Sequence, residues 1–142
     1  MRGLNAPRVS FCFGIKTMLL NFENEILVAA RLLLGGAFVF AGLRNIQNAG
    51  FLTQLMTTRG VPQARLMLWL GIVLQIVSGA LVISGVWTAA AALCLVLFLM
   101  VATPMFHNFW DHQGPERASR INGFVGNVAL TGGFLALAAQ PL

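Results

Sequence analysis

The chain has 142 residues, of which 58% are hydrophobic and only 9% are charged, and its mean hydropathy is +0.81. A soluble domain carries roughly 25% charged residues, and a soluble fold of this size could not hide so much apolar surface, so lipid must be the solvent. The net charge of +5 comes from arginines that cap the predicted membrane spans, which favours anionic lipid headgroups as partners and argues against nucleic acid.

The chain opens with a basic tail over residues 1–22. The tail combines Arg2, Arg8 and Lys16 with a broken apolar run, which is typical of a poor signal-like segment or of a segment without a fixed fold. Met18 is an alternative start of the protein. The predicted membrane domain therefore covers residues 23–142.

Four long gaps between charged residues predict four membrane-spanning helices. Each gap is close to the roughly 20 residues that cross a bilayer as a helix. A helix satisfies its own backbone hydrogen bonds in lipid, and the alternating pattern of a barrel strand is absent. The sequence thus predicts an all-α, polytopic four-helix bundle with spans at residues 26–43, 66–86, 88–106 and 121–139.

The connection between the first two spans carries an amphipathic pattern. One helical face would hold Ala49, Leu52, Leu55 and Met56, and the opposite face Gln54, Thr57 and Thr58. This pattern predicts a short helix on the membrane surface, ended by Gly60 and Pro62, with a disordered loop as the alternative. A tight turn around Gly85, with Trp87 at interface depth, makes the second and third spans antiparallel neighbours.

Small residues spaced by four indicate where helices could approach closely. The pairs are Ala37/Ala41, Ala80/Ser84, Ala129/Gly133 and Gly132/Ala136.

Few polar side chains fall inside or beside the predicted spans. They are Arg31, Arg44, Gln75, His107, Asn108, Trp110 and Asn127. A charged group inside a bilayer costs about 2.5–3.5 kcal/mol on insertion scales, so Arg31 needs a partner or a route to the interface. Helix rise allows Arg31 to meet Gln75 inside the bundle, and the alternative is that Arg31 snorkels to the near surface.

The third span ends in a polar and aromatic cluster, "TPMFHNFWDHQGPER". Pro104 lacks an N–H and should kink the helix, which would open the mouth of the bundle beside Arg44. His107 is expected to turn into this mouth, and Trp110 would share its face if the helix continued.

The same cluster raises the question of a metal. His107 and Asp111 are spaced i, i+4, but no fourth protein ligand accompanies them and His112, so we expect no metal site. His107 and Trp110 fit better as interface anchors or as groups facing a ligand. Asp111 and His112 are expected to be solvated loop residues without a fixed role.

No catalytic signature accompanies these residues. The two cysteines, Cys12 and Cys94, are not a C-x-x-C pair, and Cys94 fits as a small packing residue inside the third span. Phosphate-loop, H-E-x-x-H and G-x-S-x-G motifs are absent. The sequence therefore predicts no intrinsic catalytic residues and no intrinsic cofactor.

At its polar positions the chain resembles the DoxX family of small bacterial membrane proteins. The stretches that carry the resemblance are "ARLLLGGAFVFAGLRNIQNAGF", "RGVP", "LVISGVWTAAAAL" and "ATPMFHNFW", within residues 30–139. The matching positions are Arg31, Gly35, Phe38, Gly42, Arg44, Gly60, Pro62, His107 and Trp110. Relatives commonly have lysine at Arg44, and many have glutamate at Gln75, where the amide here leaves a hydrogen-bonding role to Arg31 rather than proton transfer.

The resemblance implies a multi-pass protein of the bacterial inner membrane. Similar proteins are subunits of a thiosulfate:quinone oxidoreductase or of complexes linked to thiol and oxidative stress. The leading hypothesis is therefore a non-catalytic subunit or anchor of a redox complex, presenting a quinone-sized ligand near Arg44, Gln75 and His107. A small carrier for an apolar or anionic molecule, with Arg31 and Arg44 along its path, and a purely structural bundle remain alternatives. The chain could also form a homo-oligomer.

The distribution of basic residues predicts the topology. The two longer connections share one side and carry five arginines, Arg44, Arg59, Arg65, Arg117 and Arg120, against three basic residues in the tail. By the positive-inside rule these connections face the cytoplasm. A reporter fused after Leu142 should therefore behave as exported, and a fusion active only in the cytoplasm would contradict this orientation.

Overall fold

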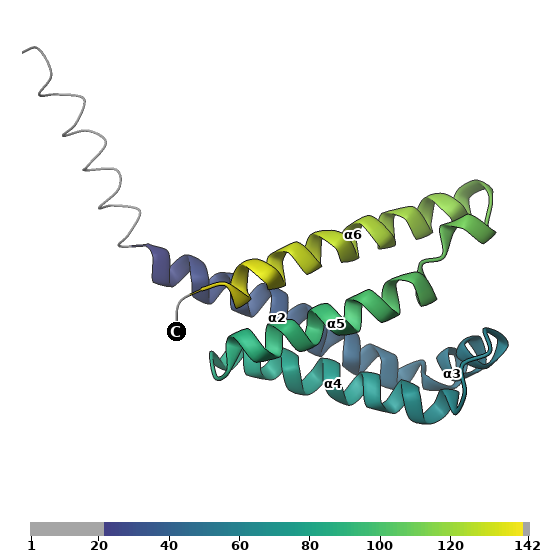
Figure 1. Cartoon of the computed structure of the whole chain (residues 1–142), viewed down its shortest axis with the longest axis horizontal. Coiled ribbons are helices and arrows are strands. Elements are labelled where there is room, and N and C mark those ends of the chain that lie inside the picture. Colours follow the sequence, from purple (N-terminus) through teal and green to yellow (C-terminus); the bar gives the residue numbers. More distant parts are fainter. Residues whose placement is uncertain (1–21, 141–142) are drawn as a thin grey trace, which may run out of the picture. The chain divides into compact units, whose positions relative to one another are not determined.

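The computed structural model describes residues 22–140, in which all regular structure is helical (Figure 1). The elements are α2 (Glu23–Gln47), α3 (Ala49–Thr58), α4 (Ala64–Ser84), α5 (Thr88–Phe106), the 3-10 helix η1 (Phe109–Asp111) and α6 (Gly114–Ala138). The helices α2, α4, α5 with η1, and α6 are long and apolar enough to cross a membrane. The predicted four spans and the shorter helix between the first two are confirmed. The predicted tail lies, except for Phe22, outside the described residues.

The chain divides into two units, residues 1–30 and 31–142. In the first unit the described residues form the beginning of α2, with Glu23 and Glu25 in its first turn. Carboxylates in a first turn are favoured there by the positive end of the helix dipole. Every contact discussed below lies within the second unit.

Two glycines bring α2 and α4 into close contact. A Cβ atom added to Gly35 would lie 2.6 Å from the carbonyl oxygen of Gly79, and one added to Gly79 would lie 2.8 Å from that of Gly35. One further Cβ, at Gly42, would lie 2.6 Å from the Ile76 side chain. These helices therefore pack backbone to backbone, as small residues permit in membranes.

Aromatic rings join α2 to the other two long helices. The Phe38 ring lies edge-on to Phe134 of α6, at a centroid distance of 5.1 Å, and edge-on to Phe98 of α5, at 6.4 Å. Phe134 is fully buried and Phe38 is buried. Edge-to-face pairs of this kind add about 0.5–1.5 kcal/mol beyond the area they bury, so Phe38 ties α2 to both α5 and α6.

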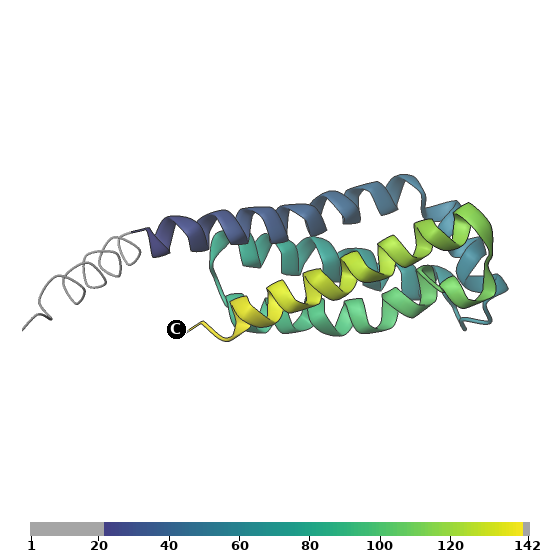
Figure 2. The same cartoon turned by 90° about the horizontal axis from the view of Figure 1, so that it is seen from above.

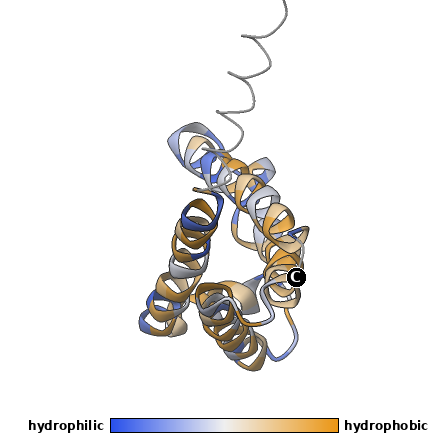
Figure 3. Ribbon diagram, turned by 90° about the vertical axis from the view of Figure 1, so that its left-hand side faces the viewer, coloured by the Kyte–Doolittle hydropathy of each residue, from blue (hydrophilic) through white to orange (hydrophobic). Residues whose placement is uncertain are grey.

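The long helices are mostly hydrophobic (Figure 3), and many of their large apolar side chains are exposed. Leu33 is 74% exposed and Phe40 is 67% exposed. Of the most apolar 18-residue stretch of α6, only 11% is buried within the protein. Water would not tolerate apolar patches on this scale, so these side chains contact the hydrocarbon of the bilayer.

The short helix α3 forms as predicted, and its apolar face packs on α4. Met56 is buried and belongs to one cluster with Leu68 and Ile72 of α4, while Gln54 and Thr57 are exposed. Part of the apolar face, Met56 with Ala49 and Leu52, therefore packs on α4, while Phe51 stays exposed.

The predicted hairpin between α4 and α5 is confirmed. Gly85 ends α4 with φ +76°, in the left-handed region that glycine adopts without steric cost, and its N–H donates to the Val82 carbonyl. Trp87 follows with φ +50° and is largely exposed. The helix α5 packs against α4 on one side and α6 on the other (Figure 1 and Figure 2).

The start predicted for the fourth span was wrong. The helix begins at Gly114, so Arg117 and Arg120, expected in a loop, lie in its first turns. Pro115 is well placed in the first turn because its missing N–H has no partner there in any helix. An ion pair of 2.9 Å between Glu116 and Arg120 also supports this turn. A stretch without charged residues predicts the part of a helix that lies in lipid, but it does not include the polar turns at the ends of that helix.

Most of the predicted small-residue contacts were also wrong. Ala80, Ser84, Ala129, Gly132 and Ala136 are exposed, whereas Gly133 meets the Leu34 side chain and Ala37 and Ala41 line the internal cavity. Gly35 and Gly79 make a close backbone contact between α2 and α4 instead. A spacing of four is common in any apolar helix, whereas facing depends on the whole bundle.

The glycine contact predicts contrasting effects of alanine at adjacent positions. Gly35→Ala should lower the free energy of unfolding by about 1–3 kcal/mol, because its methyl group would overlap a backbone oxygen. Gly36→Ala should be neutral or stabilising by up to about 1 kcal/mol, because nothing lies within 4 Å of its Cβ position. Unfolding in detergent measures both variants, and equal effects would contradict the close approach.

Candidate functional site

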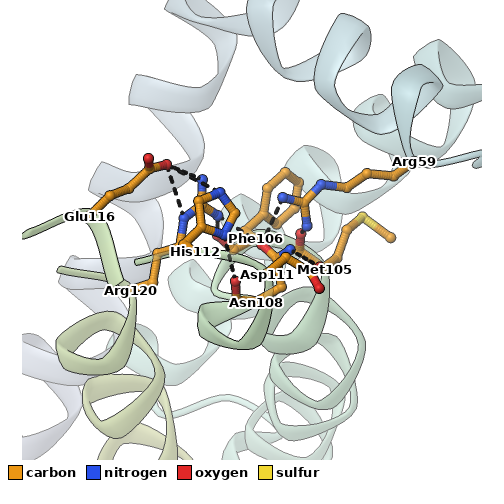
Figure 4. Close-up of polar contacts among 8 residues, drawn as sticks. All are labelled: Arg59, Met105, Phe106, Asn108, Asp111, His112, Glu116 and Arg120. Carbon is orange, nitrogen blue, oxygen red and sulfur yellow. Dashed lines mark hydrogen bonds and ion pairs between the residues drawn. The ribbon is translucent and has the colours of Figure 1, made fainter. Parts of the chain in front are cut away.

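Two arginines from different elements converge on the end of α5 (Figure 4). Arg59, which follows α3, donates from Nη1 to the Met105 carbonyl oxygen, and Arg120 of α6 donates from Nη1 to the Phe106 carbonyl oxygen at 3.2 Å. The last carbonyls of a helix have no partner within it, and they form the negative end of its dipole. The two guanidinium groups therefore cap α5 with both hydrogen bonds and charge.

Asn108 is the centre of this cluster. Its Oδ1 accepts hydrogen bonds from Arg59 Nη2 at 2.7 Å and from Arg120 Nη1 at 2.8 Å, and its Nδ2 donates to Asp111 Oδ2 at 2.7 Å. The side chain is only 7% exposed. Asn108, predicted as a ligand-binding residue, here joins three elements of the fold.

The expectation of free loop residues at Asp111 and His112 was wrong. Asp111 accepts the Asn108 amide bond, and His112 bridges the Asn108 carbonyl oxygen, 3.0 Å from Nδ1, and Glu116 Oε1, 3.2 Å from Nε2. Both side chains therefore help to hold the turn between α5 and α6. Among the described residues no three His, Cys, Asp or Glu side chains form a group that could hold a metal.

The helix does not continue through His107, so His107 and Trp110 do not share a helical face. The helix α5 ends at Phe106, two residues after Pro104, and a separate 3-10 turn holds Trp110. The His107 ring packs on Gly123 of α6, where an added Cβ would overlap the imidazole. Trp110 is 55% exposed and stacks edge-on with Phe109. Neither residue lines the cavity described next.

A cavity of about 490 Å³ lies among α2, α3, α4, α5 and α6. Its wall is mostly apolar, with Phe38, Leu68 and Phe98 among its residues, and three amide side chains interrupt it: Asn45, Gln75 and Asn127. Ligand pockets of small molecules typically measure 300–1,000 Å³ and have this composition. This cavity is the candidate binding site.

The amides are arranged as two pairs. Asn45 Nδ2 donates to Gln75 Oε1 at 2.9 Å, and Asn127 Nδ2 donates to Thr103 Oγ1 at 3.1 Å. Within residues 22–140 the Nε2 group of Gln75 has no hydrogen-bond partner. Gln75 therefore has an available donor group inside a mostly apolar cavity.

Of the two alternatives for Arg31, the pair with Gln75 does not form. The Arg31 guanidinium lies at the opposite end of α4, where a Cβ on Gly85 would be 2.7 Å from Nη1, and Gln75 bonds to Asn45 instead. This position, beside the turn that ends α4, is nearer to the alternative of a side chain directed to the near surface, but Arg31 is only half-buried and its Nε is buried with no hydrogen-bond partner among the described residues. Arg44 is exposed, and neither arginine lines the cavity.

Sequence reasoning missed Asn45 as a cavity residue and Arg59 and Arg120 as capping residues. Arg59 and Arg120 were counted only as charges that set topology. The available signal was the predicted end of the third span, because the last carbonyl groups of a helix need donors that the helix itself does not supply.

The capping cluster predicts a specific stability effect. Asn108→Ala should lower the free energy of unfolding by about 1–3 kcal/mol, because both arginines lose a shared buried acceptor. Asn122→Ala, at an exposed position of α6, is the matched control and should have little effect. Denaturation in detergent measures both, and a neutral Asn108→Ala would contradict the central role of this amide.

Comparison with known proteins agrees with this architecture. The DoxX family model matches residues 26–108, which include α3, α4 and α5. The chain is similar to the inner membrane protein YphA of Escherichia coli (strain K12), at 24% identity over 113 residues, 80% of this chain and 81% of that protein. No solved structure matches. With four membrane-spanning helices and a family match over more than half its length, the chain belongs to the DoxX family and is a multi-pass protein of the inner membrane.

Proposed function

We propose that the protein is a non-catalytic membrane subunit of a redox complex and that it binds a quinone-sized, uncharged molecule inside its helix bundle. The cavity of about 490 Å³ is the observation that carries this proposal. Its volume suits a quinone ring with the first part of an apolar tail.

The chemistry of the wall supports an uncharged ligand. The lining residues include no Arg, Lys, His, Asp or Glu, so a charged ligand would be desolvated without a counter-charge, which is costly in a low-dielectric space. A quinone carbonyl accepts hydrogen bonds, and the free Nε2 of Gln75 can donate one. Asn127 offers a second polar contact on α6.

The same wall supports a binding role rather than catalysis. It contains no thiol, imidazole or carboxylate that could move electrons or protons. Cys94 of α5 is exposed on the outer side of the helix. Oxidation and reduction of the bound molecule would then be the work of a partner protein, and the bundle would hold and orient the ring.

Photolabelling tests the ligand. An azido derivative of a short-chain ubiquinone should label cavity residues of the purified protein in nanodiscs, and unlabelled quinone should compete. Gln75→Leu should weaken binding roughly five- to tenfold, the effect of one lost hydrogen bond. Gln54→Leu, on the exposed face of α3, should leave binding unchanged.

Two results would reject quinone binding. One is label that falls only on lipid-facing residues, and the other is equal affinity in the Gln75 and Gln54 variants with both proteins folded. Redox partnership is tested separately by crosslinking in native membranes. A partner with a flavin or a reactive thiol is expected, and a chain that migrates alone on native gels would contradict the complex.

A further inference from the structure

We propose that a second site, in the hollow between α3 and α4, binds the headgroup of an anionic glycerophospholipid. The hollow has a volume of about 600 Å³. It is lined by Thr53, Thr57, Gln63, Ala64, Arg65, Leu66 and Trp69. None of these residues lines the internal cavity, so the two sites are separate.

The charge of the hollow is positive and uncompensated. Arg65 is exposed, and the ion pairs among residues 22–140 involve only Arg120 and His112 with Glu116. Arg59 and Arg120 are engaged at the end of α5, whereas Arg65 makes no hydrogen bond with any described residue. A free guanidinium with its fixed fork of donors matches the geometry of a phosphate group.

The position of the hollow along α4 fits a lipid headgroup. The membrane-spanning helix begins at Ala64, so Arg65 lies where the span meets the headgroup layer. Leu66 is 51% exposed and Trp69 is 40% exposed. An indole at this depth is typical of the membrane interface, and both side chains can contact the glycerol backbone and the upper acyl chains.

The side of the hollow formed by α3 adds acceptors for a headgroup that carries hydroxyl groups. Thr57 Oγ1 donates its proton to the Thr53 carbonyl oxygen at 2.9 Å. Its lone pairs are therefore left to accept a hydrogen bond. A glycerol headgroup supplies such donors, so phosphatidylglycerol is the probe that the hollow fits best.

Native mass spectrometry of the purified full chain tests the proposal. With added phosphatidylglycerol, the wild-type protein should retain one lipid more tightly than it retains phosphatidylcholine. Arg65→Gln should reduce this preference about tenfold, because the phosphate loses its charged hydrogen bonds with the guanidinium group. Arg117→Gln removes one exposed arginine from the first turns of α6 and should keep the preference.

The outcomes separate a built site from general attraction. Equal losses in Arg65→Gln and Arg117→Gln would show non-specific electrostatic binding and overturn the proposal. Displacement of the lipid by inorganic phosphate would also overturn it, because the contacts of Leu66 and Trp69 require a lipid. Trp69→Ala, at a half-exposed position, should weaken binding of both lipids and leave the preference for phosphatidylglycerol intact, whereas loss of that preference would contradict the separate role of Arg65.

Discussion

The fold of the second unit depends on how the end of α5 satisfies its last carbonyl groups. A helix that stops near the edge of a bilayer presents carbonyls that neither water nor lipid fully solvates. Here Arg59 and Arg120 reach these oxygens from two elements that lie far apart in the sequence. Both guanidinium groups also donate to Asn108, so the end of α5 is hydrogen-bonded to the segment after α3 and to α6.

The capping cluster also lies beside one end of the cavity. Leu52 and Met56 of α3 and Met105 and Phe106 of α5 line the cavity there, and Arg59 bonds the segment after α3 to Met105 itself. The same hydrogen bond therefore caps a helix and holds α3 over the internal space.

Lipid as solvent governs the rest of the packing. Lipid hydrocarbon is as apolar as the protein interior, so the hydrophobic effect does not drive helices together in a membrane. Helices associate there through close backbone contacts and a few hydrogen bonds. Gly35 and Gly79 allow the close approach of α2 and α4, and the two amide pairs hold polar groups inside the bundle. Where large side chains do not fill the space between α2, α4 and α5, the cavity remains.

The sequence by itself determined the solvent, the number of spans, the short helix after the first span and the hairpin at Gly85. These follow from local properties: the length of uncharged stretches, the 3.6-residue period and the left-handed turn that glycine permits. It also pointed to Gln75 and Asn108 as polar groups with a role. Only the tertiary structure decided their partners, because Asn45, Arg59 and Arg120 come from distant elements. A pattern within one helix records its depth and its faces but not which neighbour each face meets, so the sequence left open whether Arg31 pairs with Gln75, and in the structure Gln75 bonds to Asn45 instead.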